Sequence, residues 1–158
     1  MLAMQSNLAT TYADLGRHER ALQIERDVYS ERLKLQGEEH VETLMAASNY
    51  ADCLMQLKRF EEAKALFRNM IPMARRVLRE SPEITLSMRW NYAMALYEDP
   101  AATLDDLREA ATTLEDSERT ARRVLGGSHP TTGGIERHLR NARAALHARE
   151  TPSPPGSA

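Results

Sequence analysis

Residues 43–51 read Thr-Leu-Met-Ala-Ala-Ser-Asn-Tyr-Ala, and residues 85–93, which lie 42 positions later, read Thr-Leu-Ser-Met-Arg-Trp-Asn-Tyr-Ala. The triplet Asn-Leu-Ala at residues 7–9 lies 42 positions before the Asn-Tyr-Ala of residues 49–51. A fixed period that is kept at several positions is typical of a repeat array, in which each repeat is one supersecondary unit. The sequence therefore predicts stacked copies of a 42-residue unit.

Each unit contains two amphipathic helical patterns. Apolar residues recur every three or four positions from Leu44 to Leu54 and again from Ala63 to Leu78, as expected for helices with one buried face. A polar break at residues 58–59 separates the two patterns, and the matching break in the first unit contains Gly16, which can adopt the left-handed conformation that ends a helix. Each unit is therefore predicted to be a helical hairpin. Pro72 lies inside the second pattern and predicts a kink or a break there.

The third unit is longer by about five residues, which fall around residues 98–102. The helix after this insertion begins at Thr103, which has an acid three positions later and so approaches a capping box. The predicted fold is all-α: a right-handed α-solenoid of about three helical hairpins with a C-terminal capping helix. The expected parts are a repeat array over 1–149, with units at about 1–40, 41–82 and 83–129 and the capping helix at 131–149, and a disordered Pro/Ser tail at 150–158.

Composition narrows the function classes. The 158 residues are 42% hydrophobic and 28% charged, with a net charge of −2, so nothing indicates binding to nucleic acid or to a membrane. The lone Cys53 excludes an intramolecular disulfide and suits a reducing compartment, so we expect a cytoplasmic location. We find no motif for a metal, a cofactor or catalysis, and we expect that the protein is not an enzyme.

The turns between the helices carry a family resemblance. Residues 125–132 read Leu-Gly-Gly-Ser-His-Pro-Thr-Thr, which resembles the Leu-Gly-x-x-His-Pro-x-Thr motif of tetratricopeptide repeats of the kinesin-light-chain-like subtype. Residues 16–21 and 58–63 resemble the Gly-Arg-Tyr-Glu-Glu-Ala turn of the same family, and the 42-residue period also fits this subtype. The resemblance implies a superhelical array whose first helices line a concave groove that binds peptides.

The asparagines at the repeat period are the first candidate groove residues. Asn7, Asn49 and Asn91 would form a ladder whose amides can hydrogen-bond an extended peptide backbone without reading its sequence, and the resemblance implies that this position contacts ligand peptides. The alternative is that these asparagines only tie adjacent helices together. Their neighbours in the groove would include Ser48, Asp52, Trp90 and Met94. Trp90 is either an anchor for the peptide or a core residue.

The resemblance also suggests a partner. Kinesin-light-chain-like grooves prefer tryptophan-acidic peptides, and Arg137 and Arg140, at the C-terminal end of the predicted groove, would attract an acidic peptide. We therefore expect a non-catalytic adaptor that binds a short extended peptide. The alternative is a structural assembly segment, or a fragment of a longer array, that self-associates through an uncapped N-terminal end, because the chain opens directly inside its first predicted helix.

Overall fold

The computed structural model describes residues 1–79 and 82–151, and these residues contain seven α-helices and no strand. The helices, in chain order, are α1 (Leu2–Asp14), α2 (His18–Gln36), α3 (Val41–Gln56), α4 (Phe60–Val77), α5 (Pro82–Tyr97), α6 (Leu104–Val124) and α7 (Pro130–Glu150).

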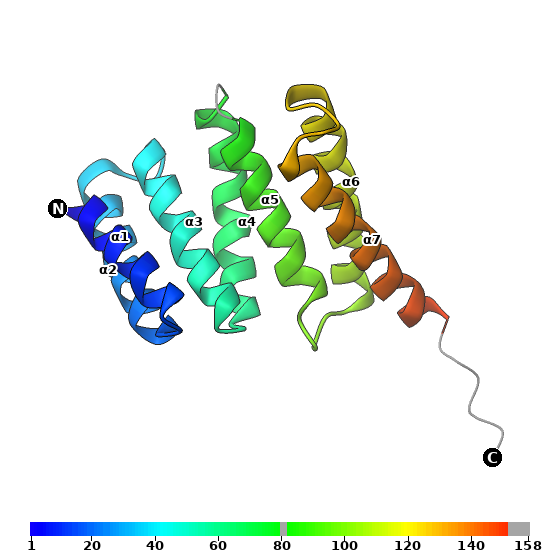
Figure 1. Ribbon diagram of the computed structural model, residues 1–158, viewed down its shortest axis with the longest axis horizontal. Helices are drawn as coiled ribbons and strands as arrows, with labels where there is room; N and C mark the ends of the chain where they lie inside the picture. The colour runs from blue at the N-terminus through cyan, green and yellow to red at the C-terminus, as the bar shows by residue number, and fades with distance from the viewer. Residues whose placement is uncertain (80–81, 152–158) are drawn as a thin grey trace, which may run out of the picture.

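Consecutive helices pack antiparallel against one another and form two layers (Figure 1). One layer contains α1, α3, α5 and α7, and the other contains α2, α4 and α6. Contacts also join α3 to α5 and α5 to α7, so the first helices of successive hairpins share one face. The predicted all-α solenoid of helical hairpins is confirmed.

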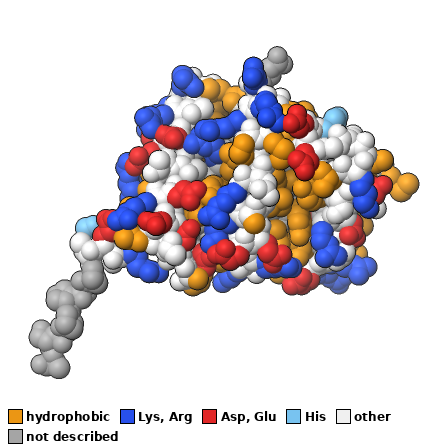
Figure 2. Space-filling model, turned by 180° about the vertical axis from the view of Figure 1, so that it is seen from behind, with side chains coloured by type: hydrophobic (Ala, Val, Ile, Leu, Met, Phe, Trp, Pro, Cys, Tyr) orange, Lys and Arg blue, Asp and Glu red, His pale blue; other side chains and the backbone are white. Residues whose placement is uncertain are grey.

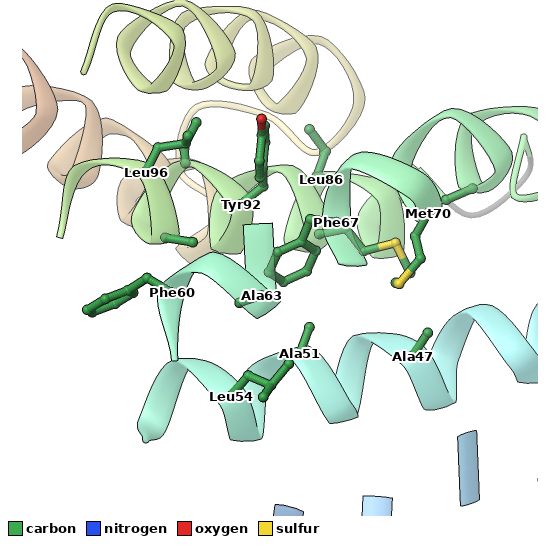
Figure 3. Packing of buried hydrophobic residues seen from close by; sticks show 14 of the residues in the cluster. Ala47, Ala51, Leu54, Phe60, Ala63, Phe67, Met70, Leu86, Tyr92 and Leu96 are labelled. Carbon is green, nitrogen blue, oxygen red and sulfur yellow. The ribbon is translucent and has the colours of Figure 1, made fainter. Parts of the chain in front are cut away.

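The core is one seam that runs through the stack and follows the repeat period. Ala9, Ala51 and Ala93 occupy the same repeat position and are at most 1% exposed, because the helices approach too closely there for a larger side chain. Figure 3 shows the centre of this seam, where the completely buried Phe67 of α4 lies between α3 and α5. The labelled residues around it are Ala47, Ala51, Leu54, Phe60, Ala63, Met70, Leu86, Tyr92 and Leu96.

The turns within the first two hairpins have the same backbone shape. Gly16 has a φ of +72°, as predicted, and Lys58, which lies 42 positions later, has a φ of 57°. Lys58 is therefore a non-glycine residue in the left-handed region, where Cβ crowds the backbone. Helix α4 continues from Phe60 to Val77 through the exposed Pro72, so the predicted break is wrong, while the kink stays a prediction.

The insertion in the third unit is attached to α4 by a buried ion pair. The ammonium of Lys64, which is 2% exposed, lies 2.9 Å from the carboxylate of Asp99 and 2.5 Å from that of Glu61. The predicted capping box is confirmed, because Thr103 Oγ1 accepts from the backbone N–H of Asp106 and the Asp106 carboxylate accepts from that of Thr103. The insertion thus ends in a defined start for α6.

The last helix extends slightly further than predicted. Helix α7 includes Glu150, which the sequence analysis assigned to the tail, and residues 152–158 of that tail lie outside the described residues. His129 caps this helix, because its Nδ1 accepts from the backbone N–H of Thr131, and His40 caps α3 in the same way with Glu42. The histidine of the turn motif is therefore a helix cap.

Candidate functional site

A hollow of about 390 Å³ lies between α3 and α5, near the start of α7. We call it the α3/α5 hollow. Its residues recur at spacings of three and four along each helix, so each helix presents one face to it. The lining is Met45, Ser48, Asn49 and Asp52 from α3, Glu83, Ile84, Ser87 and Trp90 from α5, and Thr131 from α7.

The asparagine ladder has two different environments. Asn49 is exposed and lines the α3/α5 hollow. Asn91 is half-buried, and its Nδ2 donates to Asp52 Oδ1 at 2.6 Å, so this amide ties α5 to α3. Asn7 is exposed on α1, outside the hollow. Asn91 thus takes the helix-tying role that was the alternative, while Asn49 lines the hollow and also reaches the carboxylate of Glu25.

Trp90 stands between the hollow and α7. It is half-buried, and its ring centroid lies 5.3 Å from that of His138. A Cβ added at Gly134 would lie 2.4 Å from the Trp90 ring, so glycine is required at this point of α7 for the indole to fit. The indole Nε1 is buried and has no hydrogen-bond partner among the described residues. The ring therefore packs against α7 and also forms a wall of the hollow.

Two carboxyl groups lie close together at the α2, α3 and α5 junction. Burial raises the pKa of Asp52 to about 6, against the hydrogen bond from Asn91, and the nearby Glu25 raises it further. Burial likewise raises the pKa of Glu25, which is 2% exposed, while hydrogen bonds with Ser6 and Asn49 oppose this rise. Ionisation of these two acids therefore lowers the stability of the folded protein.

The sequence analysis did not identify Glu25. The apolar spacing along the helix could have predicted its burial, because Glu25 lies on the same helical face as Ala21, Leu22 and Val28, all of which are buried. An acid at a core position of an amphipathic helix is rare unless it has a specific partner.

The other predicted groove residues do not line the hollow. Met94 is half-buried on α5, while Arg137 and Arg140 are exposed on α7. Burial raises the pKa of the Tyr97 hydroxyl to about 12, and the nearby Arg137 opposes this rise. The Tyr97 hydroxyl lies 2.5 Å from Nδ1 of His138. The two arginines are thus separate from the residues that α3 and α5 bring together.

The charge of the α3/α5 hollow is negative. Asp52 and Glu83 are its ionisable residues, and among the described residues no lysine or arginine lines it. Met45, Ile84 and Trp90 supply an apolar part. This combination suits a ligand with an apolar stem and a positive end.

Nothing in this arrangement resembles an activated nucleophile. Burial raises the pKa of the Cys53 thiol to about 11, and Glu25 and Asp52 raise it further, so the group stays a thiol near neutral pH. Within residues 1–79 and 82–151, no three His, Cys, Asp or Glu side chains are grouped so that they could hold a metal ion. In the same residues, no helix combines the length and apolar character required to cross a bilayer.

Comparisons with known proteins agree with the observed fold. Residues 1–76 match the family model of the tetratricopeptide repeat. A kinesin-light-chain-like protein with nearly identical TPR-like repeats from Podosopora anserina is 22% identical, with a TM-score of 0.75 over 94% of this chain and 68% of the other. BtubC (BKLC) from P. vanneervenii is 18% identical, with a TM-score of 0.69 over 99% of this chain and 68% of the other. No curated protein matches the sequence. Residues 1–76 therefore match the tetratricopeptide repeat family, and the chain has the fold of the kinesin-light-chain-like repeat proteins.

Proposed function

We propose that this protein is a non-catalytic adaptor that holds a short extended peptide in the groove of its first helices, with the α3/α5 hollow as the main contact. Tetratricopeptide repeats in general mediate protein–protein interactions or act as scaffolds. The proposal rests on one observation: four residues that the sequence analysis selected from the repeat period line the same hollow. They are Ser48, Asn49, Asp52 and Trp90.

The chemistry of the hollow favours a basic residue in the bound peptide. A lysine or arginine side chain could lay its methylene groups against Met45 and Ile84 and place its cation near Asp52 and Glu83. The ring of Trp90 offers a further surface for a cation. The acidic peptide that the family resemblance suggested does not suit this hollow, because both of its ionisable side chains would repel it.

Peptide binding can be tested with arrays of short extended peptides that differ only in one central residue. We expect peptides with a central lysine or arginine to bind, and the same peptides with glutamate to bind more weakly. Replacing Asp52 by Asn and Glu83 by Gln should weaken binding of the basic peptides by about tenfold or more, since each removes a charge-assisted contact. Fluorescence polarisation with labelled peptides measures both effects.

The matched control is Asp27→Asn on α2, where the carboxylate is 68% exposed and pairs only weakly with Arg26. It removes the same charge at a distance from the hollow and should leave affinity unchanged. Equal binding by the glutamate and lysine peptides, or an equal loss of affinity in Asp27→Asn and Asp52→Asn, would contradict the proposed ligand chemistry. Circular dichroism confirms that each variant keeps its helices.

A second candidate function is self-association through α1, and the exposure of its apolar side chains favours it. Met4 and Leu8 of α1 are 73% and 48% exposed, and Leu15, which directly follows this helix, is 67% exposed. Such a group of exposed side chains often marks a contact surface. Light scattering should then show a mass that grows with concentration and that falls to the monomer in Leu8→Glu. Leu35→Glu at the end of α2, which is also 67% exposed, is the control. A constant monomer mass would exclude this function.

A further inference from the structure

A second hollow lies on the opposite face of α5, where α4 ends and α5 begins. Its volume is about 180 Å³. The α3/α5 hollow uses Glu83, Ser87 and Trp90, whereas this second hollow uses residues 82, 85, 86 and 89. Helical geometry places these two sets on different faces of one helix. The side chains that carry the following argument are Arg75, Arg79, Thr85, Arg89 and Thr120.

The hollow is lined by three arginines and no acid among the described residues. It lies at the end of the stack where α4 ends and α5 begins, and in Figure 2 blue side chains gather at this end. Arg75 and Arg79 are exposed, whereas the Arg89 side chain is only 10% exposed. Three arginines around one small hollow make the surroundings positively charged.

Arg89 has few partners for a buried cation. One of its nitrogens lies 3.4 Å from the Thr113 carbonyl oxygen and 3.7 Å from Asp116, and Asp116 also pairs with Arg119. Burial lowers the pKa of Arg89, and the nearby Arg75 lowers it further. A buried guanidinium with five N–H donors and two long contacts has donors left for a ligand.

Thr85 is an independent indication of a ligand. Its repeat counterparts use their hydroxyl groups within the protein: Thr43 donates to the Arg32 carbonyl at 3.4 Å, and Thr132 donates to the Gly126 carbonyl at 2.9 Å. Thr85 is 9% exposed and lines the hollow, yet its Oγ1 has no hydrogen-bond partner among the described residues. Buried hydroxyl groups are nearly always hydrogen-bonded, so this one lacks an acceptor that a bound anion would supply.

We propose that this hollow binds a phosphate group, with Arg75, Arg79 and Arg89 as the cations and the Thr85 hydroxyl as a further donor. Several guanidinium groups match a dianion with several oxygens better than a single carboxylate, and arginine binds phosphate oxygens with two parallel N–H donors. The first turn of α5 adds the positive end of a helix dipole. The phosphate belongs either to a phosphorylated side chain of a protein partner or to the free ion.

Inorganic phosphate is the first probe, and the thermal midpoint of the intact chain is the readout. Phosphate should raise the midpoint more than chloride of the same ionic strength. General salt effects of phosphate act on all variants equally, so the comparison between variants isolates the site. Thr85→Val keeps the side-chain shape and removes the hydroxyl, and Arg75→Gln with Arg79→Gln removes two exposed cations without disturbing the core.

Both variants should lose most of the phosphate-specific rise, while Arg76→Gln should keep it, because Arg76 pairs with Glu39 and does not line the hollow. An equal rise in all four proteins, or no rise beyond that given by chloride, would overturn the proposal. A labelled phosphoserine peptide and its serine counterpart then identify the source. Binding of the phosphoserine peptide but not of the serine peptide, with competition by phosphate, indicates a phosphorylated partner, and a phosphate-specific rise with no binding of the phosphoserine peptide indicates the free ion.

Discussion

Replacing Asp52 by asparagine should stabilise this protein at neutral pH. Asp52 is a half-buried acid whose pKa is raised from 3.8 to about 6 by burial, with Glu25 close by. Asparagine has nearly the same shape, carries no charge and keeps an oxygen to accept the hydrogen bond from Asn91. The substitution therefore removes the cost of the charge and leaves the link between α3 and α5 in place.

The size of the effect follows from the two pKa values. The carboxyl group of Asp52 binds its proton more tightly in the folded protein than in the unfolded chain. Ionisation of Asp52 therefore lowers the free energy of unfolding progressively as pH rises from 3.8 to about 6. Above that range the cost is on the order of 3 kcal/mol, and below it the cost vanishes. Because the carboxylate is partly solvated, this figure is an upper limit.

Urea unfolding followed by circular dichroism measures the difference between the variant and the natural sequence. At about pH 7.5 we expect Asp52→Asn to unfold with a free energy higher by up to about 3 kcal/mol, and at about pH 3.5 by only a few tenths. Other titrating groups are common to both proteins and cancel. Asp27→Asn, which removes an exposed charge, should change stability by less than about 0.5 kcal/mol at either pH.

Two results would refute this reasoning. A variant that is less stable than the natural sequence at neutral pH would mean that the carboxylate contributes favourable contacts that outweigh its burial. An equal gain at both pH values would mean that the amide packs better and that charge has no part. If the gain is confirmed and basic peptides bind less tightly, Asp52 exchanges stability for binding, as residues of functional sites often do.

Three further substitutions test the packing of the array. Gly134→Ala places a Cβ 2.4 Å from the Trp90 ring, so it should cost about 1–3 kcal/mol and shift the tryptophan fluorescence; Gly133→Ala, which meets nothing within 4 Å, should do neither. Lys64→Met leaves the buried Asp99 carboxylate without its cation and, among the described residues, with only the backbone N–H of Ala101 as a donor, so it should cost about 3 kcal/mol in urea unfolding, whereas an unchanged midpoint would show that the ion pair is dispensable. Lys58→Gly relieves a left-handed backbone and should raise the stability by up to about 1 kcal/mol; a loss of stability would show that the lysine makes a favourable contact.

Much of the fold could be predicted from the sequence because it depends on local and periodic properties. Apolar residues at helical spacing, Gly16 at a turn and Thr103 before a helix each act over one or two turns of chain, and the 42-residue period repeats the same local rules. The position of Asn49 on the face of α3 that lines the α3/α5 hollow follows from the same register. Pro72 shows the limit, because α4 is continuous through it where local chemistry predicted a kink or a break.

The charge of the candidate sites depended on the tertiary structure. The linear sequence contains Glu25, Asp52 and Glu83 on three separate helices, and only their packing places Asp52 near Glu25 and beside Glu83 in one hollow. Packing likewise gathers Arg75, Arg79 and Arg89 on the other side of α5. Periodicity determines which residues face inward along each helix, whereas burial and the distance between side chains of different helices determine their pKa values and partners, because electrostatic interactions act through space.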